Sequence, residues 1–181
     1  MKRRSFIKKS IAVASAPFIT SGLLARTTWE KSMGKKPFNL NYAPHFGMFK
    51  HNAGDDLIDQ LQFMYDHGFR SLEDNGMKSR SKSDQNKISK KMSRLGMDMG
   101  VFVAHKIYWR EPNLTSGDKE LHDEFVQNVK DSIEIAKRVN ARWMTVVPGH
   151  VDLKKEMAYQ TANVVEALRR ASKLLEPHGL I

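Results

Sequence analysis

The sequence predicts an α/β protein, a parallel (β/α)8 TIM barrel truncated after about four βα units. Strand-like and helix-like segments alternate through residues 37–181, which is typical of parallel sheets with right-handed crossovers. Polar residues follow each strand-like segment, at the edge where barrel enzymes place their chemistry. The turn at residues 44–49 lacks the glycine pattern with which a doubly wound sheet binds a dinucleotide. These three observations favour a barrel over a dinucleotide-binding sheet.

The first half of this region contains two strand-like and two helix-like segments. Residues 38–43 are a short aromatic and apolar run ended by a proline, and residues 69–73 form the second strand candidate. Apolar residues recur at helical spacing in residues 55–67 and 83–95, and a glycine follows each segment. Ser83 is the expected N-cap of the second helix.

The second half repeats the pattern with longer elements. Residues 100–104 and 143–147 are apolar runs, as expected for strands covered on both faces. For this reason Trp143 is expected in the core. Amphipathic helices are expected over residues 120–139 and 158–175.

The length of the chain indicates half a barrel. A complete (β/α)8 barrel needs about 250 residues, whereas residues 37–181 number 145 and end in an apolar Leu180-Ile181 that resembles the start of a fifth strand. We expect the N-terminal half of a barrel, with poor stability in isolation because its parallel edge is open.

The first 25 residues have the three zones of an export signal. A basic start is followed by the uncharged, mildly apolar residues 11–24 and by small residues near Ala25. The run Arg3-Arg4-Ser-Phe-Ile-Lys8 resembles the twin-arginine class of signal. We therefore expect the twin-arginine translocase as a partner and a periplasmic or otherwise exported location. Leu23 is large for its place in the cleavage site, so anchoring by an uncleaved signal stays open.

The net charge of +10 does not indicate a nucleic-acid binder. Residues 1–36, comprising the signal and a polar linker over residues 26–36, hold nine Lys or Arg and one acid. Residues 37–181 hold 21 basic and 19 acidic residues, which is not the basic footprint of nucleic-acid binding. The chain has no cysteine, which excludes disulfides and cysteine metal sites.

Candidate site residues come from the ends of the four strand-like segments. Tyr42 and His45 follow the first, Glu73 ends the second, His105 follows the third and His150 follows the fourth. Each alone has the composition of an ordinary polar loop. Together, histidine and carboxylate side chains at one rim can exchange protons or bind a borderline divalent metal.

The connection over residues 107–118 leaves the same rim. Its Trp109 can cover a small polar ligand or stack on a sugar face. Packing of the indole on the neighbouring helix is the equally weighted alternative.

At this point the chain resembles the xylose isomerase-like TIM barrel family, the sugar phosphate isomerase/epimerase group that includes hydroxypyruvate isomerase-like proteins. The resemblance is carried by Phe38-Asn-Leu-Asn-Tyr-Ala-Pro-His-Phe46, Gly68-Phe-Arg-Ser-Leu-Glu-Asp74, Met144-Thr-Val-Val-Pro-Gly-His150 and Leu175-Glu-Pro-His-Gly-Leu-Ile181. It implies a metal-dependent isomerase or epimerase that acts on a small sugar or hydroxy-keto acid through an enediol(ate). It also implies a divalent metal (Mn, Mg or Zn).

In that family the metal carboxylates and a histidine come from strands five to eight. Catalytic residues are therefore expected after Ile181, and no metal ligand is assigned in this chain. The resemblance leaves oligomerisation open. We expect the chain to be an incomplete copy, inactive alone, that retains the substrate-binding rim.

Two other functions compete with this interpretation. An exported, non-catalytic carbohydrate-binding barrel would keep the rim without a metal. An endonuclease IV-type zinc nuclease shares the barrel and uses histidines after the third and fourth strands, which His105 and His150 match loosely. The export signal and the near-neutral body disfavour a DNA substrate.

Overall fold

The computed structural model describes residues 34–181. The expected signal peptide lies outside the described residues, and the expected linker is described only from Gly34 onward. Lys35 donates its backbone N–H to the carbonyl of Asp66 at 3.0 Å and accepts a hydrogen bond from Arg70 at 3.1 Å. The end of the expected linker is therefore already attached to the folded body.

The described elements alternate between helices and parallel strands. In chain order they are α1 (Lys50–Ala53), α2 (Leu57–Asp66), β1 (Ser71–Leu72), η1 (Met77–Ser79), α3 (Lys82–Leu95), β2 (Asp98–Val103), η2 (Leu114–Ser116), α4 (Lys119–Val139), β3 (Ala141–Thr145), α5 (Met157–Leu175) and η3 (Glu176–His178), where η denotes a 3-10 turn.

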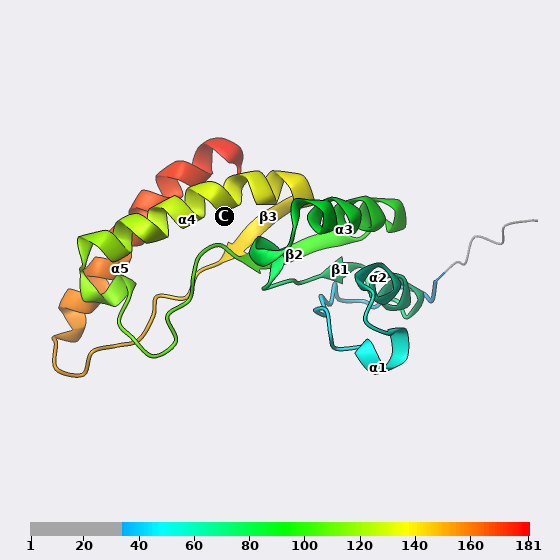
Figure 1. Ribbon diagram of the computed structural model, residues 1–181, viewed down its shortest axis with the longest axis horizontal. Helices are drawn as coiled ribbons and strands as arrows, with labels where there is room; N and C mark the ends of the chain where they lie inside the picture. Colours follow the sequence, from blue (N-terminus) through cyan, green and yellow to red (C-terminus); the bar gives the residue numbers. More distant parts are fainter. Residues whose placement is uncertain (1–33) are drawn as a thin grey trace, which may run out of the picture. The chain divides into compact units, whose positions relative to one another are not determined.

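The sheet has the order β1-β2-β3 with both pairings parallel. Helices that follow one another in the chain pack side by side, and Figure 1 shows α3 and α4 lying along the strands. The backbone of Ile181 runs beside β3, since it accepts a hydrogen bond from Met144 at 2.8 Å and donates one to Arg142 at 2.9 Å. The predicted parallel βα arrangement is confirmed.

The first strand-like segment is a correction to the sequence prediction. Residues 38–43 form no strand in the described part of the chain. Tyr42 donates its backbone N–H to Leu40, two residues earlier, at 3.0 Å, which turns the chain within the segment. Pairing with the sheet is limited to a parallel bridge between His45 and Glu73.

The start of α3 is a second correction. Ser81, in extended conformation, caps this helix by accepting the backbone N–H of Asp84 at 3.1 Å. The predicted cap, Ser83, already lies inside the helix. Asp56 and Asp118 cap α2 and α4 in the same way as Ser81 caps α3.

Two apolar clusters join the helices to the sheet. The first combines α2, α3, the end of α4 and the three strands around the fully buried Phe102, and the second lies between α4 and α5 around Phe125. Trp143, expected in the core, is 46% exposed. It pairs with Val101 on the neighbouring strand. Because side chains alternate along a strand, Trp143 and Val101 lie on one face of the sheet and Phe102 lies on the other.

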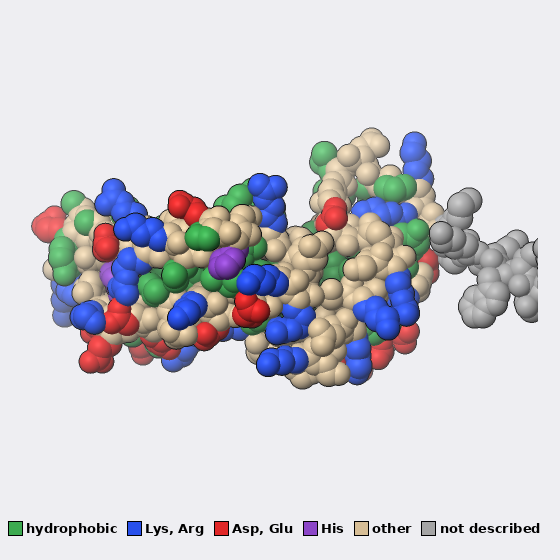
Figure 2. All heavy atoms as spheres, turned by 90° about the horizontal axis from the view of Figure 1, so that it is seen from above, with side chains coloured by type: hydrophobic (Ala, Val, Ile, Leu, Met, Phe, Trp, Pro, Cys, Tyr) green, Lys and Arg blue, Asp and Glu red, His purple; other side chains and the backbone are tan. Residues whose placement is uncertain are grey.

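The surface over α4 and α5 carries charges of both signs. Figure 2 shows Lys and Arg side chains interspersed with Asp and Glu there. Within residues 34–181 there is no helix with the length and apolar character that a membrane span requires.

The difference between Phe102 and Trp143 is testable. Phe102→Ala is expected to lower the free energy of unfolding by about 3–5 kcal/mol, because it leaves a cavity. Trp143→Ala should cost less than about 1.5 kcal/mol, because the indole keeps much of its surface in water. Urea unfolding of both variants measures the difference, and equal losses would contradict the assignment of the two faces.

Candidate functional site

The candidate site is built where the strands end. The ladder continues beyond β1 and β2, since Asp74 donates its backbone N–H to Val101 at 3.1 Å and Ala104 donates to Thr145 at 3.1 Å. The residues that follow these points are held by the sheet at one rim.

His45 and Glu73 lie next to each other on this rim. Their backbones form the parallel bridge, and Glu73 donates its N–H to Pro44 at 3.0 Å. The Glu73 carboxylate accepts a hydrogen bond from the Asn75 amide at 2.9 Å. The His45 ring is exposed, with Nδ1 3.1 Å from the Phe46 carbonyl. This pair is accessible to a ligand.

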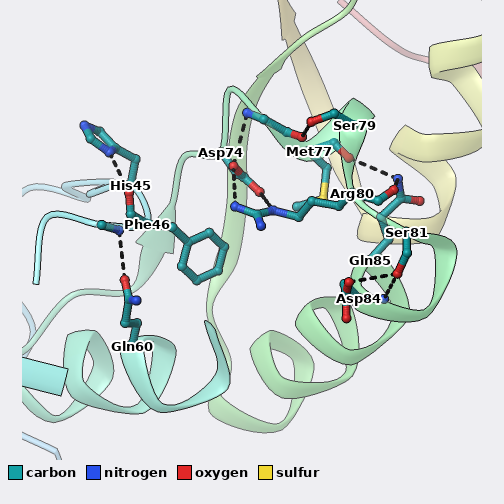
Figure 3. Close-up of polar contacts among 12 residues, drawn as sticks. His45, Phe46, Gln60, Asp74, Met77, Ser79, Arg80, Ser81, Asp84 and Gln85 are labelled. Atoms are coloured by element: carbon teal, nitrogen blue, oxygen red, sulfur yellow. Dashed lines mark hydrogen bonds and ion pairs between the residues drawn. The ribbon is translucent and has the colours of Figure 1, made fainter. Parts of the chain in front are cut away.

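Asp74 is a rim residue that follows Glu73 in the chain and was not predicted as a site residue from the sequence. Its buried carboxylate forms an ion pair with Arg80 and accepts the N–H of Gly76 at 3.2 Å. The Arg80 guanidinium also lies 4.9 Å from the centre of the Phe46 ring, and Figure 3 shows it reaching back to Asp74. Period-two alternation was an available signal, because it places Asp74 on the face of the buried Leu72 and Glu73 on the other.

His105 links the ends of β2 and β3. Its Nδ1–H donates to the Lys106 carbonyl at 2.8 Å, and Nε2 accepts the backbone N–H of Val147 at 3.0 Å. The pattern requires the neutral ring, because Nε2 acts as an acceptor. Burial lowers the pKa of His105, which also favours the neutral form. This imidazole is therefore fixed in one tautomer within the rim.

Trp109 borders a hollow of about 480 Å³ beside His105. The indole is 73% exposed, so packing on the neighbouring helix is the wrong alternative. Before it in the same loop, Lys106 donates to the Tyr108 hydroxyl at 2.9 Å, and that hydroxyl donates to Glu124 at 2.7 Å. The start of the loop is thus held by hydrogen bonds, whereas its Trp109 side chain is exposed.

Lys78 lines the same hollow and gave no signal in the sequence. Its amine donates to the carbonyls of Ala104 at 3.0 Å and Asn128 at 2.7 Å, and to the Ser132 hydroxyl at 3.3 Å. Burial lowers the pKa of this amine. All three of its donors are thus used in joining η1 to β2 and α4.

His150 and Tyr42 stand apart from the residues around the hollow. The backbone of His150 is tied to the preceding loop by bonds to Glu111 at 3.0 Å and Thr115 at 2.6 Å, while its ring is exposed. Tyr42 is exposed and makes an edge contact with Phe38. The structure therefore brings together His45 with Glu73, and His105 with Trp109.

The described residues do not fit a divalent metal centre. Among residues 34–181, no group of three or more His, Asp or Glu side chains is arranged to hold a metal ion. No step of a reaction is therefore assigned to a metal on these residues.

The buried, neutral His105 predicts a pH dependence of stability. An unfolded histidine titrates near pH 6.5. Because the pKa is lower in the folded state, the unfolded chain binds more protons as the pH falls through about 6.5, and stability decreases. His105→Gln should lose less free energy of unfolding between pH 7.5 and 5.5 than the wild type in urea titrations. The exposed His51→Gln variant is the control, and equal slopes for His105→Gln and wild type would refute the prediction.

This architecture is similar to that of known proteins. Residues 61–181 match the family model described as xylose isomerase-like TIM barrel. No curated protein has a significant match to the sequence.

Solved structures similar to this chain include a sugar epimerase and a sugar phosphate isomerase/epimerase. A D-psicose 3-epimerase from Clostridium cellulolyticum has a TM-score of 0.59 and 15% identity, with 78% of this chain and 50% of that chain covered. A sugar phosphate isomerase/epimerase from Parabacteroides distasonis has a TM-score of 0.53 and 16% identity, with coverage of 77% and 49%.

An AP endonuclease of family 2 from Brucella melitensis has a TM-score of 0.57 and 16% identity, with coverage of 76% and 52%. The chain thus spans about half the length of these structures, and at such identities the likeness concerns the fold. With the family model matching two thirds of the sequence, the chain belongs to the xylose isomerase-like TIM barrel family.

Proposed function

We propose that this chain forms the substrate-binding rim of an isomerase or epimerase of a small sugar or hydroxy-keto acid. The proposal rests on the position of His45 and Glu73, which form a parallel bridge where β1 ends. It is supported by the similar solved structures, which include sugar epimerases. The active-site rim of such barrels lies at these strand ends.

In the proposed reaction, a proton leaves the carbon beside a carbonyl group and is then returned to the substrate. Removal of the proton from the carbon beside the carbonyl gives an enediolate. Its return to the other face of that carbon gives an epimer, and its return to the neighbouring carbon gives an isomer. The divalent metal implied by the family resemblance is a prediction about the complete site, and no residue in 34–181 is assigned to it.

The rim residues are proposed to bind and orient the substrate. Glu73 is the strongest candidate, because its carboxylate has one neutral partner, Asn75, and retains accepting capacity for sugar hydroxyls. The exposed Trp109 offers an apolar face for a sugar ring. Tyr42, His45 and His150 are proposed as outer contacts, and His105 as the residue that holds the rim together.

A second candidate is an exported carbohydrate-binding protein without catalysis. It is favoured by the exposed Trp109, which borders the hollow beside His105. Exchange of a carbon-bound proton of a bound sugar with solvent would favour the enzyme over this alternative.

Binding of ketohexoses tests the role of Glu73. The full chain is titrated with D-tagatose and D-fructose, with and without Mn²⁺, and followed by saturation-transfer NMR and by deuterium uptake from D₂O. Glu73→Gln should weaken binding about ten- to hundredfold, because loss of a charged acceptor costs about 1.5–3 kcal/mol.

The matched control is Glu134→Gln, an exposed carboxylate on α4 that pairs with Lys137. It should bind like the wild type. If neither sugar binds the wild-type chain, or if Glu73→Gln binds equally well, the proposed role of Glu73 is wrong.

We also propose that residues 1–25 export the protein through the twin-arginine route. The proposal rests on the Arg3-Arg4 pair and the uncharged run that follows. Residues 1–36 fused to a fluorescent protein that folds in the cytoplasm should direct it to the periplasm of a bacterial host. Arg3→Lys with Arg4→Lys should abolish export, whereas Lys8→Arg with Lys9→Arg should preserve it. Export that survives the loss of both arginines would contradict the assignment.

A further inference from the structure

The same position of each long helix carries a buried polar side chain. Helices α2, α3, α4 and α5 begin at Leu57, Lys82, Lys119 and Met157. The fourth residue of each is buried, and these residues are Gln60, Gln85, His122 and Gln160. In each helix the backbone N–H of this residue bonds the carbonyl of the N-cap residue, so its side chain has the same starting point relative to the preceding loop.

The glutamines of α2 and α5 close their loops with both ends of the amide. Gln60 donates to the Gly54 carbonyl at 2.9 Å and accepts the Gly47 N–H at 2.8 Å. Gln160 donates to Asp152 at 2.9 Å and to Lys155 at 3.1 Å, and it accepts the Asp152 N–H at 2.8 Å. In both cases the partners are backbone groups of the segment that leads into the helix.

The other two helices use the same position for the same kind of contact. Gln85 donates to the carbonyls of Met77 at 3.0 Å and Arg80 at 3.1 Å, in the loop that also holds Asp74. Figure 3 shows the side chains of Gln60 and Gln85 among these loops. His122 lies 3.0 Å through Nε2 from the Leu114 carbonyl, which requires a protonated Nε2 that donates.

We infer that these four side chains are the positioning residues of the rim loops. Each donates to backbone carbonyls of its own loop in a buried or partly buried setting, where a lost hydrogen bond is costly. Each donates to the backbone of the segment that leads into its own helix, so loss of this contact should release that segment and leave the sheet intact. Gln85 has a further partner, since it accepts a hydrogen bond from Arg138 in α4 at 2.6 Å. The consequence for ligand binding rests on the function proposed above, whereas the consequence for loop order does not.

The chemistry of the contacts defines which substitutions are tolerated. A side-chain donor is required at this position, because every one of the four bonds at least one carbonyl. Glutamine and histidine both supply a donor of similar reach, whereas an ionised glutamate supplies only acceptors. His122→Gln should therefore preserve its loop, and Gln160→Glu should not.

Hydrogen exchange followed by mass spectrometry tests the inference on the full chain. Gln160→Leu and Gln160→Glu should speed exchange in residues 151–156 about tenfold or more, since a single unmade hydrogen bond shifts a local opening equilibrium by this order. Exchange in β2 should change by less than about threefold, because opening is local. Gln127→Leu, which removes an exposed amide bonded to Asp131, is the matched control and should leave residues 151–156 unchanged.

A second pair of variants keeps the test decisive if the Gln160 variants are poorly folded. His122→Gln should show wild-type exchange in residues 106–117, whereas His122→Leu should show faster exchange there. Equal acceleration in β2 and the loop, or loss of order in His122→Gln as large as in His122→Leu, would overturn the inference. If the loop effects appear and D-tagatose binding is absent in the wild type, the positioning role stands and the proposed function fails.

Discussion

The parallel pairing of β2 with both of its neighbours is the interaction on which the rest of the structure depends. The ladder extends past the ends of β1 and β2 to Asp74 and Ala104, so the sheet determines where the rim begins. Beyond the sheet, two buried contacts hold the rim in place, namely the Asp74–Arg80 ion pair and the hydrogen bond from Val147 to His105. Because these groups are neutral or paired, their burial does not leave an isolated charge in the interior.

The helices were predictable from the sequence because their apolar stripes and stop signals are local. The limits of α4 and α5 differ from the sequence prediction by one residue at the N-terminus. Trp143 was not predictable, because an apolar strand of this kind has no alternation to tell its two faces apart, and the ladder register decides which face the indole takes. Residues 38–43 contain strand-forming residues, but a strand also needs a neighbour, which composition does not report.

Within the candidate site, the sequence predicted which residues follow the strands but not the hydrogen bonds and ion pairs among them. Polar character after a strand identified His45, Glu73 and His105, since it depends only on position. Lys78 could not be found this way, because its three acceptors come from Ala104, which follows β2, and from α4, far along the chain. The recurrence of Gln or His at the fourth helical residue is visible in the sequence, although its meaning depends on the backbone groups that the loops present.

The antiparallel bridge between Pro112 and Gly149 has a consequence for how the rim can move. It joins the loop after β2 to the loop after β3, and bonds from Leu114 to Pro148 and from His150 to Glu111 flank it on both sides. Gly149 has a positive φ and lies so close to Asn113 that a side chain there would clash. The two loops are therefore joined by backbone hydrogen bonds, so a displacement of the loop that carries Trp109 would be transmitted to the His150 backbone.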